Sequence, residues 1–544
     1  MRNLVLLLVT VVATSCSIVK TVLRGEDFIS VIPDVNEGIY VLTQSHFERP
    51  NAHYLITNNC SLQGKQIRMP ANCTITFIDG SLNNGIIVGV DTYVNSRNKK
   101  IFGDDLILKG TFSAKAAKPI WFGIKPDCIL DSDGKYISGT DWVGKFASLL
   151  LFNRIQLDDE GIYYINGHLT TRSNQYIEGN NAIIKWRYLK HNALFQIGSV
   201  NGYKYVEDVK LSNINIIGNK LETDDVTEFC HGVSVGYASD IVIDNVSVFY
   251  CRGDGIYVGT SVTAPRREMT PKNISLRRVR CEYNHRQGLS VTRVDGLCVD
   301  NSDFSYTSGT SPGAGIDIEP NDLIDDEGTL YITECLNISI SNCRFEGNEG
   351  YGVVMGNSAC NQDNVADAIN NISISKCIFQ NNKLYISGGT NINVNSLEMQ
   401  NSPIEIRAPG YTENLTMRNV KTCSNIEDNE LSAVTFILYS VNNANSKLNN
   451  IVFDNLDISG FGAYGINIPD YKSRGTSLSY IDRVTIQNST INDCAVPIYV
   501  GSLIKNKEIT SNTYVPRRLE KLTKNQQLIR ELVPSGIYVY EENE

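Results

Sequence analysis

The chain has 544 residues, with 49 Lys and Arg against 59 Asp and Glu, and a formal net charge of -10. Nucleic-acid binding depends on clustered Lys and Arg, and the sequence has no such cluster before its C-terminal tail, so we expect no nucleic-acid partner. A chain of this length is long enough for one large domain or for several ordinary ones.

Residues 1–16 have the pattern of an export signal. Arg2 is followed by an apolar run from Leu4 to Ala13 and then by small residues ending at Cys16. The run is too short to span a bilayer. The segment resembles bacterial lipoprotein signals, which implies that Cys16 is acylated and anchors an exported protein in the cell envelope, at the outer membrane or the cell surface. The alternative is a plain secretory signal, in which Cys16 is lost on cleavage.

Residues 17–125 are expected to form a small β-rich cap. Two stretches, 59–89 and 110–134, resemble the region that precedes the first coils in bacterial and phage-tailspike β-helix proteins. In those relatives a Trp-Phe-Gly is followed by an Asp-rich turn and a short helix. The composition of residues 141–152 suits that helix, and the composition of residues 161–169 suits the strand after it.

Residues 126–510 contain a degenerate repeat of one structural unit. Each copy has two short alternating strands, a polar corner with Asn, and a Gly followed by an apolar, a variable and an apolar residue. Alternation with period two predicts strands, and a spacing of roughly 20 to 37 residues between copies fits the coils of a solenoid. The copies include 240–258, 273–291, 337–355, 371–387, 450–468 and 483–500.

Over residues 165–505 these units resemble the parallel β-helices of the pectate-lyase and polygalacturonase type. The resemblance implies an all-β chain: a single-stranded right-handed parallel β-helix (solenoid) that follows the N-terminal cap and acts on a carbohydrate. Polygalacturonase-type enzymes carry Asn-Thr-Asp, Asp-Asp, Gly-His-Gly and Arg-Ile-Lys motifs. Here "GDG" (253–255) keeps one Asp, whereas 285–288 and 292–296 match the other motifs only in part.

The apolar residues on both sides of the variable position are expected to point inward, as Ile316 and Ile318 do in one unit. We also expect inward stacks of like residues, which would fill the core and satisfy backbone groups. The members of these stacks are Cys343 with Cys377, and the corner residues Asn245, Asn342 and Asn455.

The variable position is expected to face outward and to stack from one coil to the next. Adjacent coils lie about 4.8 Å apart, so Asp254 and Asp317, two coils apart, would be separated by about 10 Å. The outward column is predicted to run through Ser234, Tyr257, Ser290, Asp317, Val354, Tyr385, Glu405 and Asn467.

The stretch "GAGIDIEPND" (313–322) supplies the candidate catalytic pair. Asp317 and Glu319 are two residues apart on a strand and share its exposed face, with Asp254 across the groove. Glycosidic bonds are broken by one protonated and one ionised carboxyl group, and mutual repulsion would raise one pKa of the pair as a general acid requires. The sequence therefore favours a polysaccharide-cutting glycoside hydrolase with Asp317, Glu319 and Asp254 as catalytic residues.

The expected substrate-binding residues combine cations for an acidic sugar with a ring that can stack on a pyranose. They are His231, Tyr257, His285, Arg286, Arg293 and Asp322. A polysaccharide lyase, an epimerase on the same fold, and a non-catalytic β-helix for glycan binding or adhesion remain alternatives. The segment 319–328 is either an acidic surface loop or a Ca2+ site without EF-hand spacing. No other cofactor is expected.

Residues 511–544 are expected to form a C-terminal cap. Their leucines recur at helical spacing, which predicts a short amphipathic helix that closes the open end of the coils. These leucines are Leu519, Leu522, Leu528 and Leu532.

Overall fold

The structure is a computed structural model, and its described residues form two compact units. The first unit holds residues 28–126, 144–158 and 176–178, and the second holds the other described residues. The expected signal and Cys16 lie outside the described residues. The described ranges are 28–188, 190, 192–200, 202–224, 227–260, 267–324, 330–356, 368–408, 411–426, 429–438, 448–469, 471–473, 476–478, 481–501, 504, 506–515, 517–518 and 521–532.

The first unit consists mainly of short parallel strands in two sheets. One sheet contains β1 (Phe28–Ser30), β4 (His53–Ile56), β6 (Gln66–Arg68), β7 (Thr74–Phe77), β9 (Gly85–Ser96) and β10 (Leu106–Ser113). The other contains β2 (Asp34–Asn36), β3 (Ile39–Val41), β5 (Asn59–Ser61) and β8 (Ser81–Asn83). The 3-10 helices η1 (Gln44–His46) and η2 (Pro119–Phe122), most of the helix α3 (Val143–Leu149), and β13 (Arg154–Gln156) also belong to this unit.

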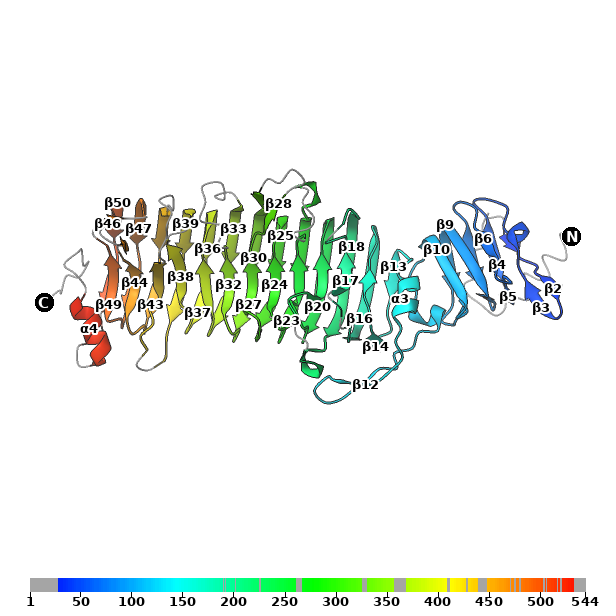
Figure 1. Cartoon of the computed structure of the whole chain (residues 1–544), viewed down its shortest axis with the longest axis horizontal. Helices are drawn as coiled ribbons and strands as arrows, with labels where there is room; N and C mark the ends of the chain where they lie inside the picture. The colour runs from blue at the N-terminus through cyan, green and yellow to red at the C-terminus, as the bar shows by residue number, and fades with distance from the viewer. Residues whose placement is uncertain are drawn as a thin grey trace. The chain divides into compact units, whose positions relative to one another are not determined.

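The second unit is a stack of coils, and Figure 1 shows its strands side by side. One face is a parallel sheet of 12 strands. Its strands are β15 (Leu169–Thr170), β17 (Asn192–Ile197), β19 (Cys230–Val235), β21 (Ile256–Val258), β24 (Gln287–Val291), β27 (Ala314–Ile318), β32 (Tyr351–Met355), β35 (Lys383–Ile386), β38 (Ile404–Ala408), β41 (Val434–Leu438), β44 (Tyr464–Ile468) and β49 (Val496–Val500).

The remaining faces of the coils form one continuous parallel sheet, which bends where each coil turns. Its part in the second unit begins with the short strand β14 (Ile162–Ile165), which is followed by the long strands β16 (Gln175–Trp186), β18 (Val206–Ile217) and β20 (Ala238–Phe249). Each later coil adds a pair of strands: β22 (Lys272–Arg277) and β23 (Arg280–Glu282), β25 (Val294–Asp300) and β26 (Asp303–Ser305), β30 (Cys335–Ser341) and β31 (Arg344–Glu346), β33 (Ile369–Ser375) and β34 (Ile378–Gln380), β36 (Gly389–Asn395) and β37 (Glu398–Gln400), β39 (Thr412–Arg418) and β40 (Lys421–Cys423), β42 (Leu448–Asp454) and β43 (Asp457–Ser459), β47 (Arg483–Gln487) and β48 (Thr490–Asn492), and β50 (Asn506–Thr510) and β51 (Thr513–Val515).

Three hairpins complete the secondary structure of the described residues. They pair β11 (Ile129–Leu130) with β12 (Tyr136–Ser138), β28 (Asp322–Ile324) with β29 (Leu330–Ile332), and β45 (Tyr471–Ser473) with β46 (Thr476–Leu478). Two 3-10 helices, η3 (Lys220–Glu222) and η4 (Arg267–Met269), lie in turns between coils.

Period-two alternation sets the inside and the outside of each coil, as predicted. Ile316 and Ile318 are at most 1% exposed and pair with the equally buried Val353 and Met355 of the next coil. The outward column is confirmed as well, because Tyr257, Ser290 and Asp317 are paired in that order. The prediction missed Thr435, which stands between Glu405 and Asn467, and the column also continues to Gln196 before Ser234 and to Tyr499 after Asn467.

The expected inward stack of Asn245, Asn342 and Asn455 is wrong. These residues are exposed, and their left-handed backbone, with φ between 54° and 55°, turns the chain at the corner. Their side-chain amides donate outside the core instead, for example from Asn455 to Oδ1 of Asn419 at 2.7 Å. Asn tolerates left-handed backbone better than most residues, which accounts for its place at the corner.

Buried asparagines do form a ladder, but at another turn. Asn348 and Asn382 are at most 5% exposed. Nδ2 of Asn348 donates to Oδ1 of Asn382 at 2.7 Å, and Nδ2 of Asn382 donates to the carbonyl of Asn348 at 2.9 Å. Cys343 and Cys377 are buried as expected, and every cysteine in the described part of the chain is a free thiol.

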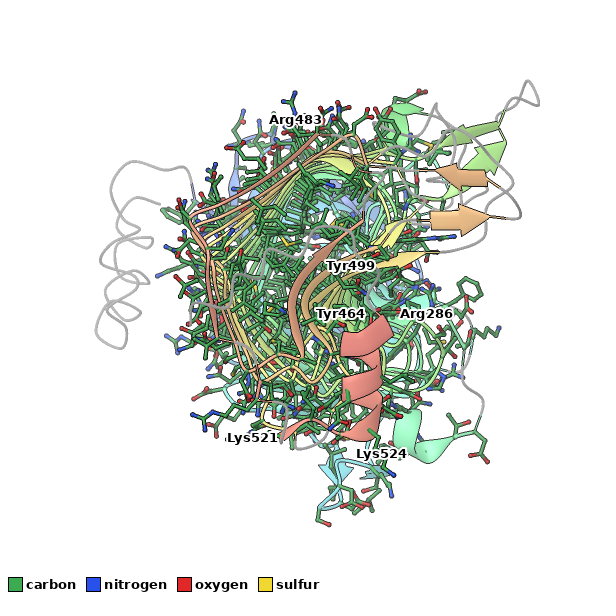
Figure 2. The ribbon with its side chains drawn as sticks, turned by 90° about the vertical axis from the view of Figure 1, so that its left-hand side faces the viewer. Arg286, Tyr464, Arg483, Tyr499, Lys521 and Lys524 are labelled. Atoms are coloured by element: carbon green, nitrogen blue, oxygen red, sulfur yellow. The ribbon has the colours of Figure 1, made fainter. Side chains whose placement is uncertain are left out.

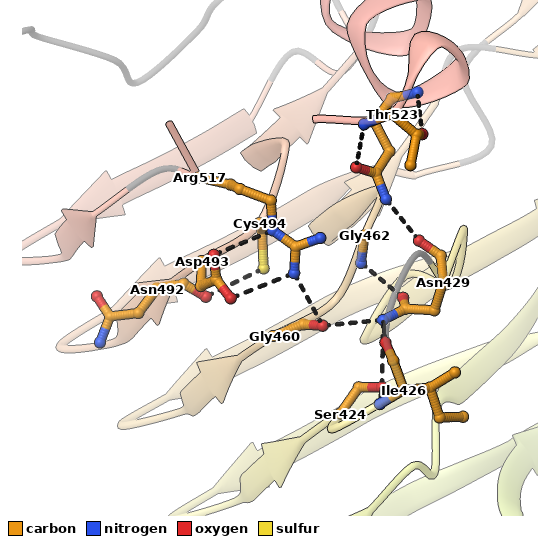
Figure 3. A network of polar contacts seen from close by, with 11 residues as sticks. Ser424, Ile426, Asn429, Gly460, Gly462, Asn492, Asp493, Cys494, Arg517 and Thr523 are labelled. Atoms are coloured by element: carbon orange, nitrogen blue, oxygen red, sulfur yellow. Dashed lines mark hydrogen bonds and ion pairs between the residues drawn. The ribbon is translucent and has the colours of Figure 1, made fainter. Parts of the chain in front are cut away.

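The C-terminal helix exists, but polar groups hold it. The helix α4 spans Lys524–Leu532, and Thr523 and Gln526 cap its start through reciprocal hydrogen bonds of 3.0 and 3.2 Å. Nε2 of Gln526 also donates to the carbonyl of Asn429 at 2.8 Å (Figure 3). Asn429 and Arg517 both donate to the carbonyl of Gly460. The helix is thus fastened to turns of earlier coils.

The prediction that Leu528 lies on a buried apolar face of this helix is wrong. Leu528 is 51% exposed, whereas Gln526 is fully buried and Leu522, just before the helix, is 7% exposed. Among the described hydrogen bonds none joins α4 to β50 or β51, and Figure 2 shows the helix below Tyr464, at the end of the coils that faces the viewer. The side chains of Leu519 and Leu532 lie outside the described residues. The closure of the open end by this helix therefore stays a prediction.

Of the helices in the described ranges, none is both long and apolar enough to cross a membrane. The short helix expected within 141–152 is present as α3, and β14 and β15 occupy the segment expected to be a strand.

Candidate active site

A pocket of about 570 Å3 lies on the outer side of the 12-stranded sheet in the second unit, and we call it the Arg286 pocket. Figure 2, which looks along the coils, places Arg286 on the same side as Tyr464 and Tyr499 of this sheet. The predicted site residues that line the pocket are His231, Tyr257, Arg286 and Glu319, and they are joined there by Gln196, Glu228, Phe229, Ser234, Thr292 and Asn321.

Two rings form one wall of the pocket. The rings of His231 and Tyr257 are stacked, with centroids 5.0 Å apart and planes inclined by 16°. The hydroxyl groups of Tyr257 and Thr292 share a hydrogen bond of 2.8 Å. Burial raises the pKa of Tyr257 to about 12, so the phenol stays protonated and offers a hydrogen bond at neutral pH.

Asp254 lies under this wall and is fully buried. Its Oδ2 is 3.2 Å from Nδ1 of His231 and 3.6 Å from Nη1 of Arg286. The flanking glycines permit this position, because a Cβ on Gly255 would stand 2.7 Å from the carbonyl of Gly288 in the next coil. The "GDG" turn therefore buries a carboxylate between an imidazole and a guanidinium, instead of presenting it across an open groove as predicted.

Arg286 is the centre of charge in the pocket. Its Nη2 lies 3.9 Å from Oε2 of Glu319. Burial lowers the pKa of Arg286, but the carboxyl groups of Asp254, Asp317, Glu228 and Glu319 outweigh it and raise that pKa above its usual value. The guanidinium stays charged, and its buried Nε has no hydrogen-bond partner among the described residues.

Asp317 faces outward, but it is 2% exposed and does not line the pocket, which corrects the expectation of an open carboxylate pair. Nε2 of Gln287 donates to its Oδ2 at 2.9 Å. Burial, and after it the neighbouring Glu319, raise the pKa of Asp317 well above its usual range. The predicted direction of the pKa shift is confirmed, although burial contributes more than repulsion.

The raised pKa makes Asp317 a source of pH-dependent stability. The folded state keeps a proton that the unfolded chain releases above a pKa of about 3.9, so folding weakens as pH rises from there through the folded-state pKa. Asp317→Asn should therefore raise the unfolding midpoint at pH 7, and the gain should shrink toward pH 4. Thermal unfolding at pH 4 and at pH 7 measures this difference. Asp159→Asn, at an exposed position, is the control. An equal rise of the unfolding midpoint at both pH values in Asp317→Asn would contradict the prediction.

Two predicted binding residues are not in this pocket. Arg293 is 2% exposed; its Nε donates to Thr270 at 2.9 Å and its Nη1 to Thr260 at 3.2 Å. His285 is 9% exposed, its Nε2 lies 3.0 Å from the hydroxyl of Thr310, and burial lowers its pKa. Both side chains thus form hydrogen bonds with threonines outside the strands and do not line the Arg286 pocket. The side chain of Asp322 lies outside the described residues.

Glu228 is the pocket carboxylate that sequence reasoning missed. It precedes β19 in a turn between coils, where the repeat assigns no position, so no pattern marks it. The one feature of the sequence that points to Glu228 is its position three residues before the candidate His231.

Within the described residues, no cluster of three or more His, Cys, Asp or Glu side chains could hold a metal ion. Residues 325–329 of the acidic segment considered for Ca2+ lie outside the described residues, so the Ca2+ site stays a prediction.

Comparison with known proteins supports the fold. Residues 199–402 match the family model of the right handed beta helix region. The SPbeta prophage-derived uncharacterized protein YorA of Bacillus subtilis (strain 168) is 25% identical over 266 residues, which cover 43% of this chain and 43% of that protein. Uncharacterized protein YclG of the same strain is 30% identical over 185 residues, 29% of this chain and 31% of that protein. The chain thus matches less than half of either relative.

Solved structures with a similar course of the chain include a phage protein and an enzyme. The N-terminal fragment of bacteriophage Phi29 gene product 12 has a TM-score of 0.44 at 15% identity, covering 73% of this chain and 66% of that one. The catalytic unit of a GH87 alpha-1,3-glucanase from Streptomyces thermodiastaticus has a TM-score of 0.43 at 13% identity, covering 74% and 70%. At these identities the likeness concerns the fold alone. The family-model match over residues 199–402 and the observed coils show that the second unit has the fold of a right-handed parallel β-helix.

Proposed function

We propose that the Arg286 pocket binds and hydrolyses a polysaccharide, with Glu228 and Glu319 as the carboxyl groups that reach the substrate. The observation that carries this proposal is their convergence, since both carboxylates line one pocket around a single guanidinium. One carboxyl group would protonate the glycosidic oxygen, and the other would attack the sugar or activate a water molecule. The pocket volume of about 570 Å3 suits a few sugar units.

The buried residues would support this chemistry from below. Asp254 holds Arg286 and His231 in place through contacts of 3.6 and 3.2 Å. Asp317, protonated because of its raised pKa, lies beside Glu319 and would fix the position of that carboxylate. The stacked ring of Tyr257 would pack against a sugar, as aromatic side chains with a polar tip do.

The charge of the pocket favours a neutral sugar. Arg286 is the one Lys or Arg in the described lining, and Asp254, Glu228 and Glu319 surround it. Since these carboxylates already balance the guanidinium, an added uronate carboxylate would meet net repulsion. The expectation of an acidic substrate relied on Arg293 and His285 joining Arg286 in the site, and neither side chain lines the pocket.

A lyase or epimerase is the second candidate, and the contact between His231 and Asp254 favours it. A histidine held by a carboxylate can remove a proton, and Arg286 could neutralise the carboxylate of a uronate. Both reactions need an acidic substrate, which the surrounding carboxylates oppose.

A panel of neutral and uronate polysaccharides tests the proposal. We expect the purified protein to release reducing ends from at least one neutral polymer without forming products that absorb as unsaturated sugars. Unsaturated products from a uronate polymer would establish the lyase. Binding without any change in the polymer would establish the non-catalytic alternative.

We propose further that acylated Cys16 holds the protein at the cell envelope, on the basis of the lipoprotein-like signal. A Cys16→Ala variant should then leave the membrane fraction on cell fractionation. Recovery of an unmodified Cys16 peptide from the mature protein would contradict the anchor.

A further inference from the structure

We propose that the first unit carries a second binding site, which takes an acidic oligosaccharide through a sugar carboxylate. A pocket of about 470 Å3 lies among β9, β13, β16 and the segment before η2, and we call it the Arg154 pocket. All of its described lining residues belong to the first unit. The inference does not depend on the function proposed for the Arg286 pocket.

The charge of this pocket is opposite to that of the Arg286 pocket. Lys115, Lys118 and Arg154 line it, and Glu178 is the one acidic residue in its described lining. The hydroxyl of Tyr176 donates to Oε2 of Glu178 at 2.8 Å. None of the three cations makes an ion pair with a described residue, although the chain as a whole carries a net charge of -10. An anionic ligand is therefore attracted here.

The strand pairing places the polar side chains of the Arg154 pocket on the outer surface. Ile155 is 2% exposed and is bridged to the buried Ala117, so their neighbours along the chain point away from the core. Arg154 is paired with Tyr176 on the next strand. Adjacent strands lie about 4.8 Å apart, so the guanidinium and the phenol ring stand next to each other on the surface.

This pairing fits a sugar that bears a carboxylate. A planar guanidinium binds a carboxylate through two parallel hydrogen bonds, and a tyrosine ring packs against the apolar face of a pyranose. Lys118, whose Nζ donates to Oδ1 of Asn98 at 2.8 Å, adds a second cation. The amides of Asn95 and Gln156 in the lining can bond sugar hydroxyls.

An unused hydroxyl points to the same conclusion. The Oγ of Ser96 is buried in the lining of this pocket and has no hydrogen-bond partner among the described residues. Buried polar atoms in folded proteins usually have a partner, and a sugar hydroxyl in the pocket would supply one.

Calorimetric titration of the full chain with a trigalacturonate tests the inference. We expect binding by the native chain, and a loss of affinity of at least about tenfold in Arg154→Gln, the scale of a lost charge-assisted hydrogen bond. Lys115→Gln provides a second variant at an exposed position, should the first fail to fold. Lys109→Gln, on β10 and outside the lining, is the matched control and should bind as the native chain does.

Three results would overturn the inference: no binding by the native chain, unchanged binding by the Arg154 and Lys115 variants, or equal binding of a neutral galactose trimer. Displacement of the trimer by inorganic sulfate at equal concentration would show a general anion site and refute the carboxylate assignment. Arg286→Gln removes the only Lys or Arg from the described lining of the Arg286 pocket and leaves the described lining of the Arg154 pocket unchanged, so trigalacturonate binding by that variant separates this site from the proposed active site.

Discussion

Replacing Glu319 by Gln is expected to lower turnover of the substrate polysaccharide by at least about a hundredfold, the usual scale of general acid–base catalysis. The amide keeps the shape of the side chain and removes its titrating proton. Glu319 is part-exposed, and it contacts the neighbouring carboxyl group of Asp317 and, at 3.9 Å through Oε2, Arg286; Gln can keep both contacts, so folding should change little. Release of reducing ends, measured at saturating substrate, gives the change in kcat.

Two further variants show whether the loss of turnover is specific to the carboxylates of the Arg286 pocket. Glu228→Gln should give a loss of similar size, because both carboxylates are needed for cleavage. Glu398→Gln, on the exposed side of β37, is the matched control and should retain native turnover. If Glu319→Gln and Glu228→Gln both retain native turnover, the reaction takes place elsewhere on the protein.

Replacing Lys185 by Met is expected to lower the free energy of unfolding by about 3–5 kcal/mol, the cost of breaking a buried ion pair. Lys185 is 1% exposed and contacts Glu222. Its Nζ also donates to the carbonyls of Gly134 and Gly218 at 2.9 and 2.7 Å. Met fills a similar volume but donates no hydrogen bond, so two carbonyls and part of a carboxylate lose their partner. Urea unfolding followed by circular dichroism measures the change.

The double variant Lys185→Met, Glu222→Gln should recover part of this loss, because it removes the uncompensated carboxylate. Lys272→Met, at an exposed position on β22, is the control and should change stability by less than about 0.5 kcal/mol. A loss below about 1 kcal/mol in Lys185→Met would mean that Arg187, whose Nε lies 2.8 Å from Oε2 of Glu222, compensates the charge alone.

The repeat predicts which residues of each coil face the core and which face outward. Because strand side chains alternate, the inward position of Ile316 and the outward position of Asp317 follow from the sequence without any knowledge of the partners. The order of Tyr257, Ser290 and Asp317 in one column follows from the same pattern, and the pairings confirm it.

The repeat does not predict how exposed an outward-facing side chain is to solvent. Asp317 faces outward yet is covered, because Gln287 from the preceding coil bonds to it and Glu319 lies over it. Glu228 reaches the pocket from a turn whose length varies between coils, so no register predicts its position. The repetition of the corner asparagines suggests an inward stack, whereas the backbone at the corner requires a residue that tolerates the left-handed conformation and leaves its side chain outside.

A crystal structure of the Glu319→Gln variant with an oligosaccharide of the cleaved polymer tests whether the Arg286 pocket is the active site. We expect a sugar ring in the Arg286 pocket, packed against Tyr257, with its glycosidic oxygen within hydrogen-bond distance of Glu228 or of the amide introduced in place of Glu319. A sugar bound on other coils, with the Arg286 pocket empty, would contradict it.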